Sequence, residues 1–176
     1  MYHALARAAD GLSRLMALLG GAILVGIVVL TCISIAGRAL VPLNIGVGPI
    51  RGIYDITEIG MAAAICAFLP LCQLQRGHAT VDLFERAIPP LMNRLLDLLF
   101  DIGMLVIAIF GGHRLYLGMI DKRSFGETTL IAQIPVWYGY ALSLVGAVAF
   151  ALVAAFCVLR SARALAGRPT EETAHV

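Results

Sequence analysis

The chain has 176 residues, of which 60% are hydrophobic and 14% are charged, whereas soluble domains are about half apolar and a quarter charged. With a mean hydropathy of +0.91, this composition excludes a water-soluble globule and predicts an integral membrane protein. The net charge of +2 comes without a dense block of Lys and Arg, which excludes a nucleic-acid-binding patch.

The four cysteines do not form the pattern of a disulfide framework or a zinc site. Cys32, Cys66 and Cys157 lie inside apolar stretches, Cys72 lies near the end of one, and no two of them form a C-x-x-C pair. This spacing predicts small apolar core residues, and we expect no resident metal or other cofactor.

Two apolar stretches in the first half of the chain each predict a membrane-spanning helix. Residues 1–14 are mildly polar and are expected to be a cytoplasmic lead-in. Residues 15–37 then run for 23 residues without a charge, which is long enough to cross a bilayer. A signal peptide is the alternative for this stretch, but its apolar core is too long. Arg38 closes the first span, and the second span covers about residues 54–74.

The stretch after the second span predicts a short interfacial helix and a third span. Residues 89–97 begin with two prolines and then place apolar and polar side chains on opposite sides, a pattern typical of an amphipathic helix lying in the membrane interface. The third span covers about residues 98–116. It carries Asp101 at one end and His113 and Arg114 at the other.

The last span covers about residues 135–159 without a charge, and a hydrophilic tail, residues 160–176, follows it. Trp137 and Tyr138 at its start predict an aromatic anchor at the membrane interface. The fold class is therefore all-α, with a four-helix membrane domain over residues 15–159. Eight arginines lie on the side of the two termini and five basic residues on the other side, which predicts that both termini are cytoplasmic.

Charged residues near the span ends are candidates for structural contacts. Arg38 and Glu58 fall at the same membrane face and are expected to pair, with separate snorkelling to water as the alternative. A proton or sodium site at Glu58 is a third interpretation. Arg51 and Asp55 are four residues apart and can pair on one helical face.

Asp97 and Asp101 are four residues apart near the start of the third span. Arg94 can pair with Asp97, and both acids complement the dipole at a helix N-terminus. The sequence thus predicts a local role for them.

A stripe of small residues marks one face of the last span: Gly139, Ser143, Ala147, Ala151 and Ala155 follow one another in steps of four. Such a smooth stripe lets another helix approach closely. Packing within the four-helix unit and packing against a partner subunit are both open for it.

No arrangement of residues indicates catalysis. The chain has no G-x-S-x-G, no phosphate-binding glycine loop and no H-E-x-x-H, so we expect it not to be an enzyme. His78 and Asp82 are four apart, but a polar loop between two helices explains them better than a metal half-site.

Short motifs at the span ends occur in a distinctive order: Arg38 ends the first span, Thr57-Glu58 enters the second, Arg76-Gly77-His78-Ala79-Thr80-Val81-Asp82 follows it, and Ile134-Pro135-Val136-Trp137 opens the fourth. This order resembles the small membrane subunit of tripartite ATP-independent periplasmic (TRAP) transporters, the DctQ-like family. The resemblance covers about Leu15 to Leu159, and its best single match is the Gly77-His78-x-x-Val81-Asp82 segment.

The resemblance implies a fixed scaffold subunit in the bacterial inner membrane, with both termini cytoplasmic. It implies a large DctM-like permease subunit that holds the substrate and sodium sites, and a periplasmic binding protein that delivers an organic acid. A self-sufficient small four-helix transporter and a membrane anchor for a redox complex are the alternatives. The candidate structural or subunit-interface residues are Arg38, Asp55, Glu58, Arg76, Gly77, His78, Asp82, Pro135, Trp137, Gly139, Ser143 and Ala147.

Overall fold

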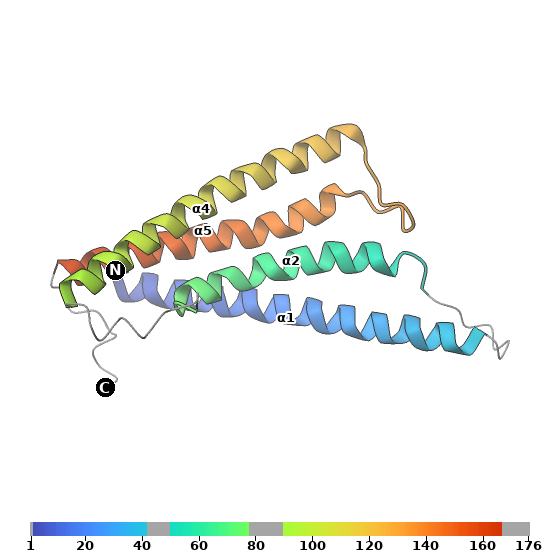
Figure 1. The fold of residues 1–176 in the computed structure, drawn as a ribbon, viewed down its shortest axis with the longest axis horizontal. Helices are drawn as coiled ribbons and strands as arrows, with labels where there is room; N and C mark the ends of the chain where they lie inside the picture. Colours follow the sequence, from blue (N-terminus) through green and yellow to red (C-terminus); the bar gives the residue numbers. More distant parts are fainter. Residues whose placement is uncertain (1, 42–49, 78–89, 167–176) are drawn as a thin grey trace.

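The computed structural model describes residues 2–41, 50–77 and 90–166, and these residues form four long helices (Figure 1). The helices are α1 (Tyr2–Leu40), α2 (Ile53–Leu74), α4 (Pro90–Phe125) and α5 (Trp137–Leu165). Each is long and apolar enough to cross a membrane. The prediction of an all-α fold with four membrane-spanning helices is confirmed.

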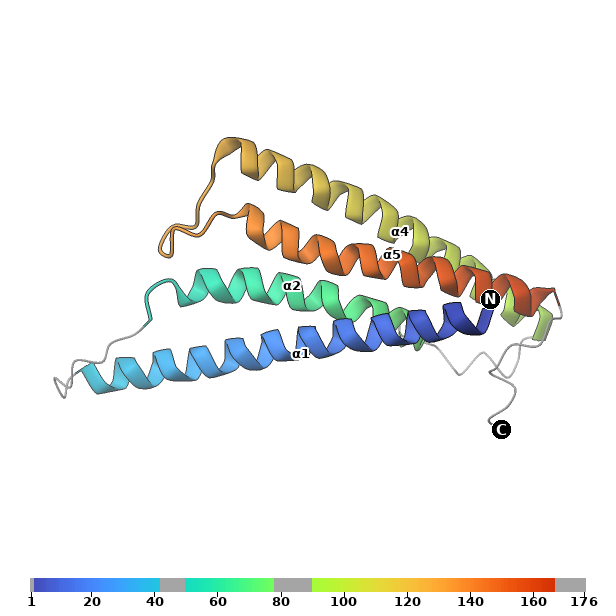
Figure 2. The same cartoon turned by 180° about the vertical axis from the view of Figure 1, so that it is seen from behind.

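The helices lie side by side in one row, in the order α1, α2, α5, α4 (Figures 1 and 2). They converge where α1 begins and spread toward the opposite end. We call these the terminal end and the loop end, because residues 126–136 join α4 to α5 at the second one. The two central helices, α2 and α5, therefore carry most of the packing.

A stripe of buried residues fixes α1 against α2. Ser13, Gly20, Ile27 and Ser34 are all buried and follow at intervals of seven. Since seven residues are close to two helical turns, they line one seam along the helix. A Cβ atom on Gly20 would lie 3.1 Å from the Cβ of Ala67, so the glycine is what lets the two backbones come this close.

The tightest helix contact joins α5 to α2 at Gly146. A Cβ atom there would lie 2.6 Å from the carbonyl carbon and oxygen of Cys66, closer than any side chain permits. At the terminal end, the Tyr2 ring of α1 stacks on the Phe156 ring of α5 at 5.8 Å between centroids. The Arg163 guanidinium of α5 lies 4.4 Å from the centroid of the Tyr2 ring. These contacts tie the first helix to the last.

Two helices extend beyond the predicted spans. α1 begins at Tyr2, so the polar lead-in belongs to the same helix as the first span. Residues 90–97 are the first turns of α4, and a separate interfacial helix is not confirmed; Pro89 and the link before it lie outside the described residues. α4 also continues past the third predicted span because its apolar pattern resumes, and it ends beside Gly126, whose φ of 62° is non-helical.

Candidate functional site: polar contacts at both ends of the helix row

The C-terminus of α2 ends in a turn in which an arginine takes a left-handed backbone conformation. The amide of Gly77 donates to the carbonyl of Cys72 at 2.9 Å, and the amide of Arg76 donates to that of Gln73 at 3.2 Å. This pair of bonds is the Schellman motif, whose left-handed residue is usually glycine. Here the positive φ, 51°, falls on Arg76 although Gly77 is the next residue.

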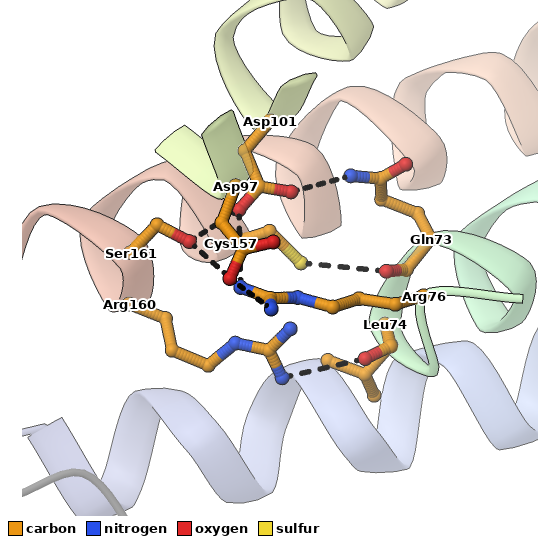
Figure 3. Close-up of polar contacts among 8 residues, drawn as sticks. All are labelled: Gln73, Leu74, Arg76, Asp97, Asp101, Cys157, Arg160 and Ser161. Atoms are coloured by element: carbon orange, nitrogen blue, oxygen red, sulfur yellow. Dashed lines mark hydrogen bonds and ion pairs between the residues drawn. The ribbon is translucent and has the colours of Figure 1, made fainter. Parts of the chain in front are cut away.

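The side chain of Arg76 explains why an arginine occupies that position. Its guanidinium donates to Asp97 Oδ2 at 2.6 Å and to Ser161 Oγ at 3.0 Å (Figure 3). It also lies 3.8 Å from Asp101 Oδ2. The turn therefore aims one cation from α2 at two acids of α4 and a hydroxyl of α5.

Asp101 is the centre of this contact set. Asp101 is 4% exposed, and among the described residues it is the one buried charged residue. Gln73 Nε2 donates to Asp101 Oδ1 at 3.0 Å, and the Ser161 hydroxyl donates to Oδ2. A buried carboxylate is tolerated only when hydrogen bonds and an opposite charge replace its water, and α2 and α5 supply both. We call Gln73, Arg76, Asp97, Asp101 and Ser161 the polar cluster.

Side chains of α5 also bind the terminal carbonyls of α2. Arg160 Nη1 donates to the carbonyl of Leu74 at 3.3 Å, and Cys157 Sγ lies 3.8 Å from the carbonyl of Gln73 (Figure 3). The last carbonyls of a helix lack partners within it, and a cation there complements the helix dipole. The terminal end of α2 is thus fastened to α5 through backbone and side chains together.

At the loop end, Asp55 fastens α2 to the loop between α4 and α5. Its Oδ2 accepts from the amides of Ile131 at 3.1 Å and Ala132 at 2.8 Å. Gly52 has a φ of 76°, and a Cβ atom on it would lie 2.5 Å from the Cβ of Ala132, so only glycine fits beneath the loop. The predicted pairing of Asp55 with Arg51 is wrong, because α2 begins at Ile53 and the carboxylate faces the loop.

The loop itself is internally paired. Thr128 and Pro135 form an isolated antiparallel bridge, and the amide of Val136 donates to the carbonyl of Glu127 at 3.0 Å. Trp137 opens α5 directly after it, and the Arg123 guanidinium of α4 lies 5.4 Å from its ring. These contacts hold the loop ends of α4 and α5 together.

Arg38 and Glu58 do not meet. Among the described residues, no ion pair joins them, and both side chains are exposed. Arg38 lines a groove between α1 and α2 together with Thr57. Glu58 is not among the residues that line this groove, which on α2 are Ile53, Tyr54 and Thr57. The predicted pair is therefore not formed: Arg38 lines the groove and Glu58 does not.

The small residues of α5 pack inside the chain. Gly139, Ser143 and Ala147 are buried; Gly139 faces Ile59 of α2, whereas Ala147 faces Gly112 of α4. Steps of four advance by about 40° around a helix, so the predicted stripe drifts from one neighbour to the other.

Two of the predicted site residues, His78 and Asp82, lie outside the described residues. Sequence reasoning missed the polar cluster, because Asp97 and Asp101 were given only a local role. Arg94, the expected partner of Asp97, donates instead to the carbonyl of Ala164 at 3.3 Å. The sequence did contain a signal for this cluster: Asp101 lies about one turn inside the third predicted span, and Arg76 is predicted at the same membrane face.

The chain was compared with known protein families, curated proteins and solved structures. The family model described as "Tripartite ATP-independent periplasmic transporters, DctQ component" matches residues 27–166, which is well over half of the chain. No curated protein and no solved structure matches the chain significantly.

Proposed function

The chain belongs to the DctQ family, the small membrane component of TRAP transporters, and from this membership we propose that it is a fixed scaffold for a large DctM-like permease subunit. In this proposal a periplasmic binding protein delivers an organic acid to the large subunit, and a sodium gradient drives uptake. The family is a transporter component and not an enzyme family.

The observation that carries the scaffold role is that α2 is fastened at both ends. The polar cluster ties its terminal end to α4 and α5, and Asp55 ties its loop end to the α4–α5 loop. A subunit that stays still while its neighbour moves needs helices whose relative positions are fixed, and these contacts supply such a constraint.

The disposition of charge favours ion and substrate sites in the partner. Asp101, the one buried charged side chain among the described residues, already accepts hydrogen bonds from Gln73 and Ser161 beside the Arg76 cation. Glu58 is exposed near the loop end. Neither arrangement offers a free carboxylate in the middle of the membrane, which a self-sufficient transporter of four helices would need.

We place the chain in the bacterial inner membrane with the terminal end in the cytoplasm and the loop end in the periplasm. The support is the excess of arginines on the terminal side, eight against at most five basic residues on the loop side. In this orientation the α4–α5 loop faces the compartment of the binding protein.

Co-purification tests the proposed assembly. The tagged chain is expressed with the large DctM-like permease subunit of the same transporter, solubilised and passed over a sizing column. We expect the two chains to elute together as one species. Elution of the tagged chain alone, with the large subunit present in the same membranes, would contradict the scaffold role.

A further inference from the structure

α4 carries two polar side chains, His113 and Arg114, well inside its membrane-spanning length. We take two contacts as the ends of that length: Arg123 lies beside the Trp137 ring at the loop end, and Asp101 bonds to Ser161 at the terminal end. At 1.5 Å per residue, Arg114 is about 14 Å from the level of Arg123 and about 20 Å from the level of Asp101. A hydrocarbon core about 30 Å thick therefore contains it.

The guanidinium of Arg114 does not reach toward the nearer water. It lies 5.3 Å from the ring centroid of Phe110, which is one turn farther from the loop end. Side chains on a helix lean toward its N-terminus, and for α4 that direction leads toward the middle of the membrane. A cation–π contact offsets only part of the cost of a charge in hydrocarbon.

The face of α4 that carries Arg114 has no neighbour within the described residues. α4 packs on α5 through a different face, where Ala108 is buried and a Cβ atom on Gly112 would lie 4.0 Å from the Cβ of Ala147. His113 and Arg114 are exposed, and so are Phe110 at 61% and Val106 at 59%. α4 is at the edge of the helix row (Figure 1), and its outer face thus carries exposed apolar side chains with one cation among them.

We propose that this face of α4 is the contact surface for a membrane helix of the large permease subunit, and that a carboxylate on that helix pairs with Arg114 inside the membrane. The proposal rests on the proposed function, since it needs the large subunit. The positive charge of Arg114 requires an acidic side chain on the partner, at a depth where water and headgroups are absent.

A second copy of this chain does not meet that requirement. The described acidic residues of the membrane domain lie toward the two ends: Asp55, Glu58, Asp121 and Glu127 near the loop end, and Asp97 and Asp101 near the terminal end. A copy in the same orientation brings none of them to the depth of Arg114. Lipid phosphates lie outside the hydrocarbon core and are equally out of reach.

The test compares recovery of the large subunit by tagged variants of this chain. Arg114→Leu should lower recovery about tenfold or more, because it leaves the partner's carboxylate buried without a counter-charge. Arg114→Lys keeps the charge and should recover more than Arg114→Leu. The matched control, Arg51→Leu, removes an exposed arginine near the loop end and should recover as much as the wild type.

The outcomes separate this inference from the proposed function. A wild-type chain that fails to recover the large subunit contradicts the proposed function. If the Arg114→Leu variant recovers as much of the large subunit as the wild type does, the α4 interface is contradicted and the proposed function is not. Without the large subunit, Arg114→Leu should melt at or above the temperature of the wild type; a lower melting temperature would assign Arg114 to the chain's own fold.

A photo-crosslinking residue in place of Phe110 identifies what covers the face. An adduct with the large subunit is the expected product. An adduct with a second copy of this chain, or with lipid alone, would overturn the proposal.

Discussion

Arg76 shows how one residue combines a backbone cost with a side-chain gain. Its φ of 51° places a Cβ-bearing residue in a conformation that is about 1–2 kcal/mol less favourable than right-handed backbone. The same conformation directs the guanidinium to Asp97 and Asp101 of α4. We infer that the electrostatic contacts outweigh the backbone cost.

Two substitutions at Arg76 separate these contributions. Arg76→Ala loses the ion pairs and keeps the strained backbone, whereas Arg76→Gly loses the ion pairs and relieves the strain. Both should be less stable than the wild type, with Arg76→Gly more stable than Arg76→Ala by about 1 kcal/mol. Thermal unfolding of the purified chain in detergent measures the order. An Arg76→Ala protein as stable as Arg76→Gly would show that the turn is not strained.

The other residues of the polar cluster give the buried Asp101 carboxylate its hydrogen bonds and its counter-charge. Asp101→Asn keeps the shape and removes the charge, which leaves Arg76 with the more exposed Asp97 as its remaining anionic partner. We expect a loss of about 3 kcal/mol in the free energy of unfolding. Asp121→Asn, on the exposed loop end of the same helix, is the control and should stay within about 0.5 kcal/mol. Equal stability of the two variants would mean that the charge of Asp101 does not stabilise the fold.

At the scale of the elements, the contact between α5 and α2 depends on Gly146. A Cβ atom on Gly146 would meet the backbone of Cys66, which cannot move aside as a flexible side chain does. The predicted stripe of small residues passes beside this position without including it. Close helix approach is decided by which residue faces the neighbour, and that depends on the rotation of the helix as well as on residue size.

Gly146→Ala tests this packing. We expect the free energy of unfolding to fall by about 1–3 kcal/mol, because the helices must separate to admit the methyl group. Gly111→Ala is the matched control, since a Cβ atom at Gly111 meets nothing within 4 Å and alanine favours the helix. Thermal unfolding of both variants checks the difference. A Gly146→Ala chain as stable as the control would contradict the close approach.

The loop end offers a test of the bond between α2 and the α4–α5 loop. Asp55→Ala removes the acceptor for the amides of Ile131 and Ala132, and those two amides should then exchange with solvent deuterium faster, by about tenfold for a lost bond worth 1–1.5 kcal/mol. Glu58→Ala, one turn along the same helix, should leave their exchange unchanged. Unchanged exchange in Asp55→Ala would show that the loop does not depend on α2.

The existence of the four spans was predictable, and their ends were not. Long charge-free runs such as residues 15–37 indicate a spanning helix on length and hydropathy alone. The end of the third span was placed near Arg114 because charges commonly mark the membrane surface, yet α4 runs on to Phe125. A helix ends where its hydrogen bonds are broken or capped, and the charges at His113 and Arg114 do neither.

The polar cluster was beyond the reach of the sequence for a different reason. Arg76 and Asp97 are 21 residues apart, and Gln73 and Asp101 are 28 apart. Periodicity gives the faces of single helices, but not the rotation and register with which three helices meet. Asp55 was singled out as a candidate, while its partners lie 76 and 77 residues away in a loop.

At the scale of the whole molecule, the four helices lie in a single row (Figures 1 and 2), and many of their large apolar side chains are exposed. Val25 and Val28 of α1 and Phe110 of α4 are all more than half exposed. The row is fastened internally at both ends, and its exposed faces are free to contact a large neighbour. We expect this combination of a scaffold subunit in a transporter whose substrate crosses the membrane through another subunit.

Uptake by reconstituted vesicles tests the central claim most directly. The large DctM-like subunit is placed in proteoliposomes with or without this chain, the periplasmic binding protein is added outside with a labelled organic acid that it binds, and a sodium gradient is applied. The scaffold account predicts uptake only when both membrane chains are present and none with this chain alone. Uptake by this chain alone, or undiminished uptake by the large subunit without it, would contradict the account.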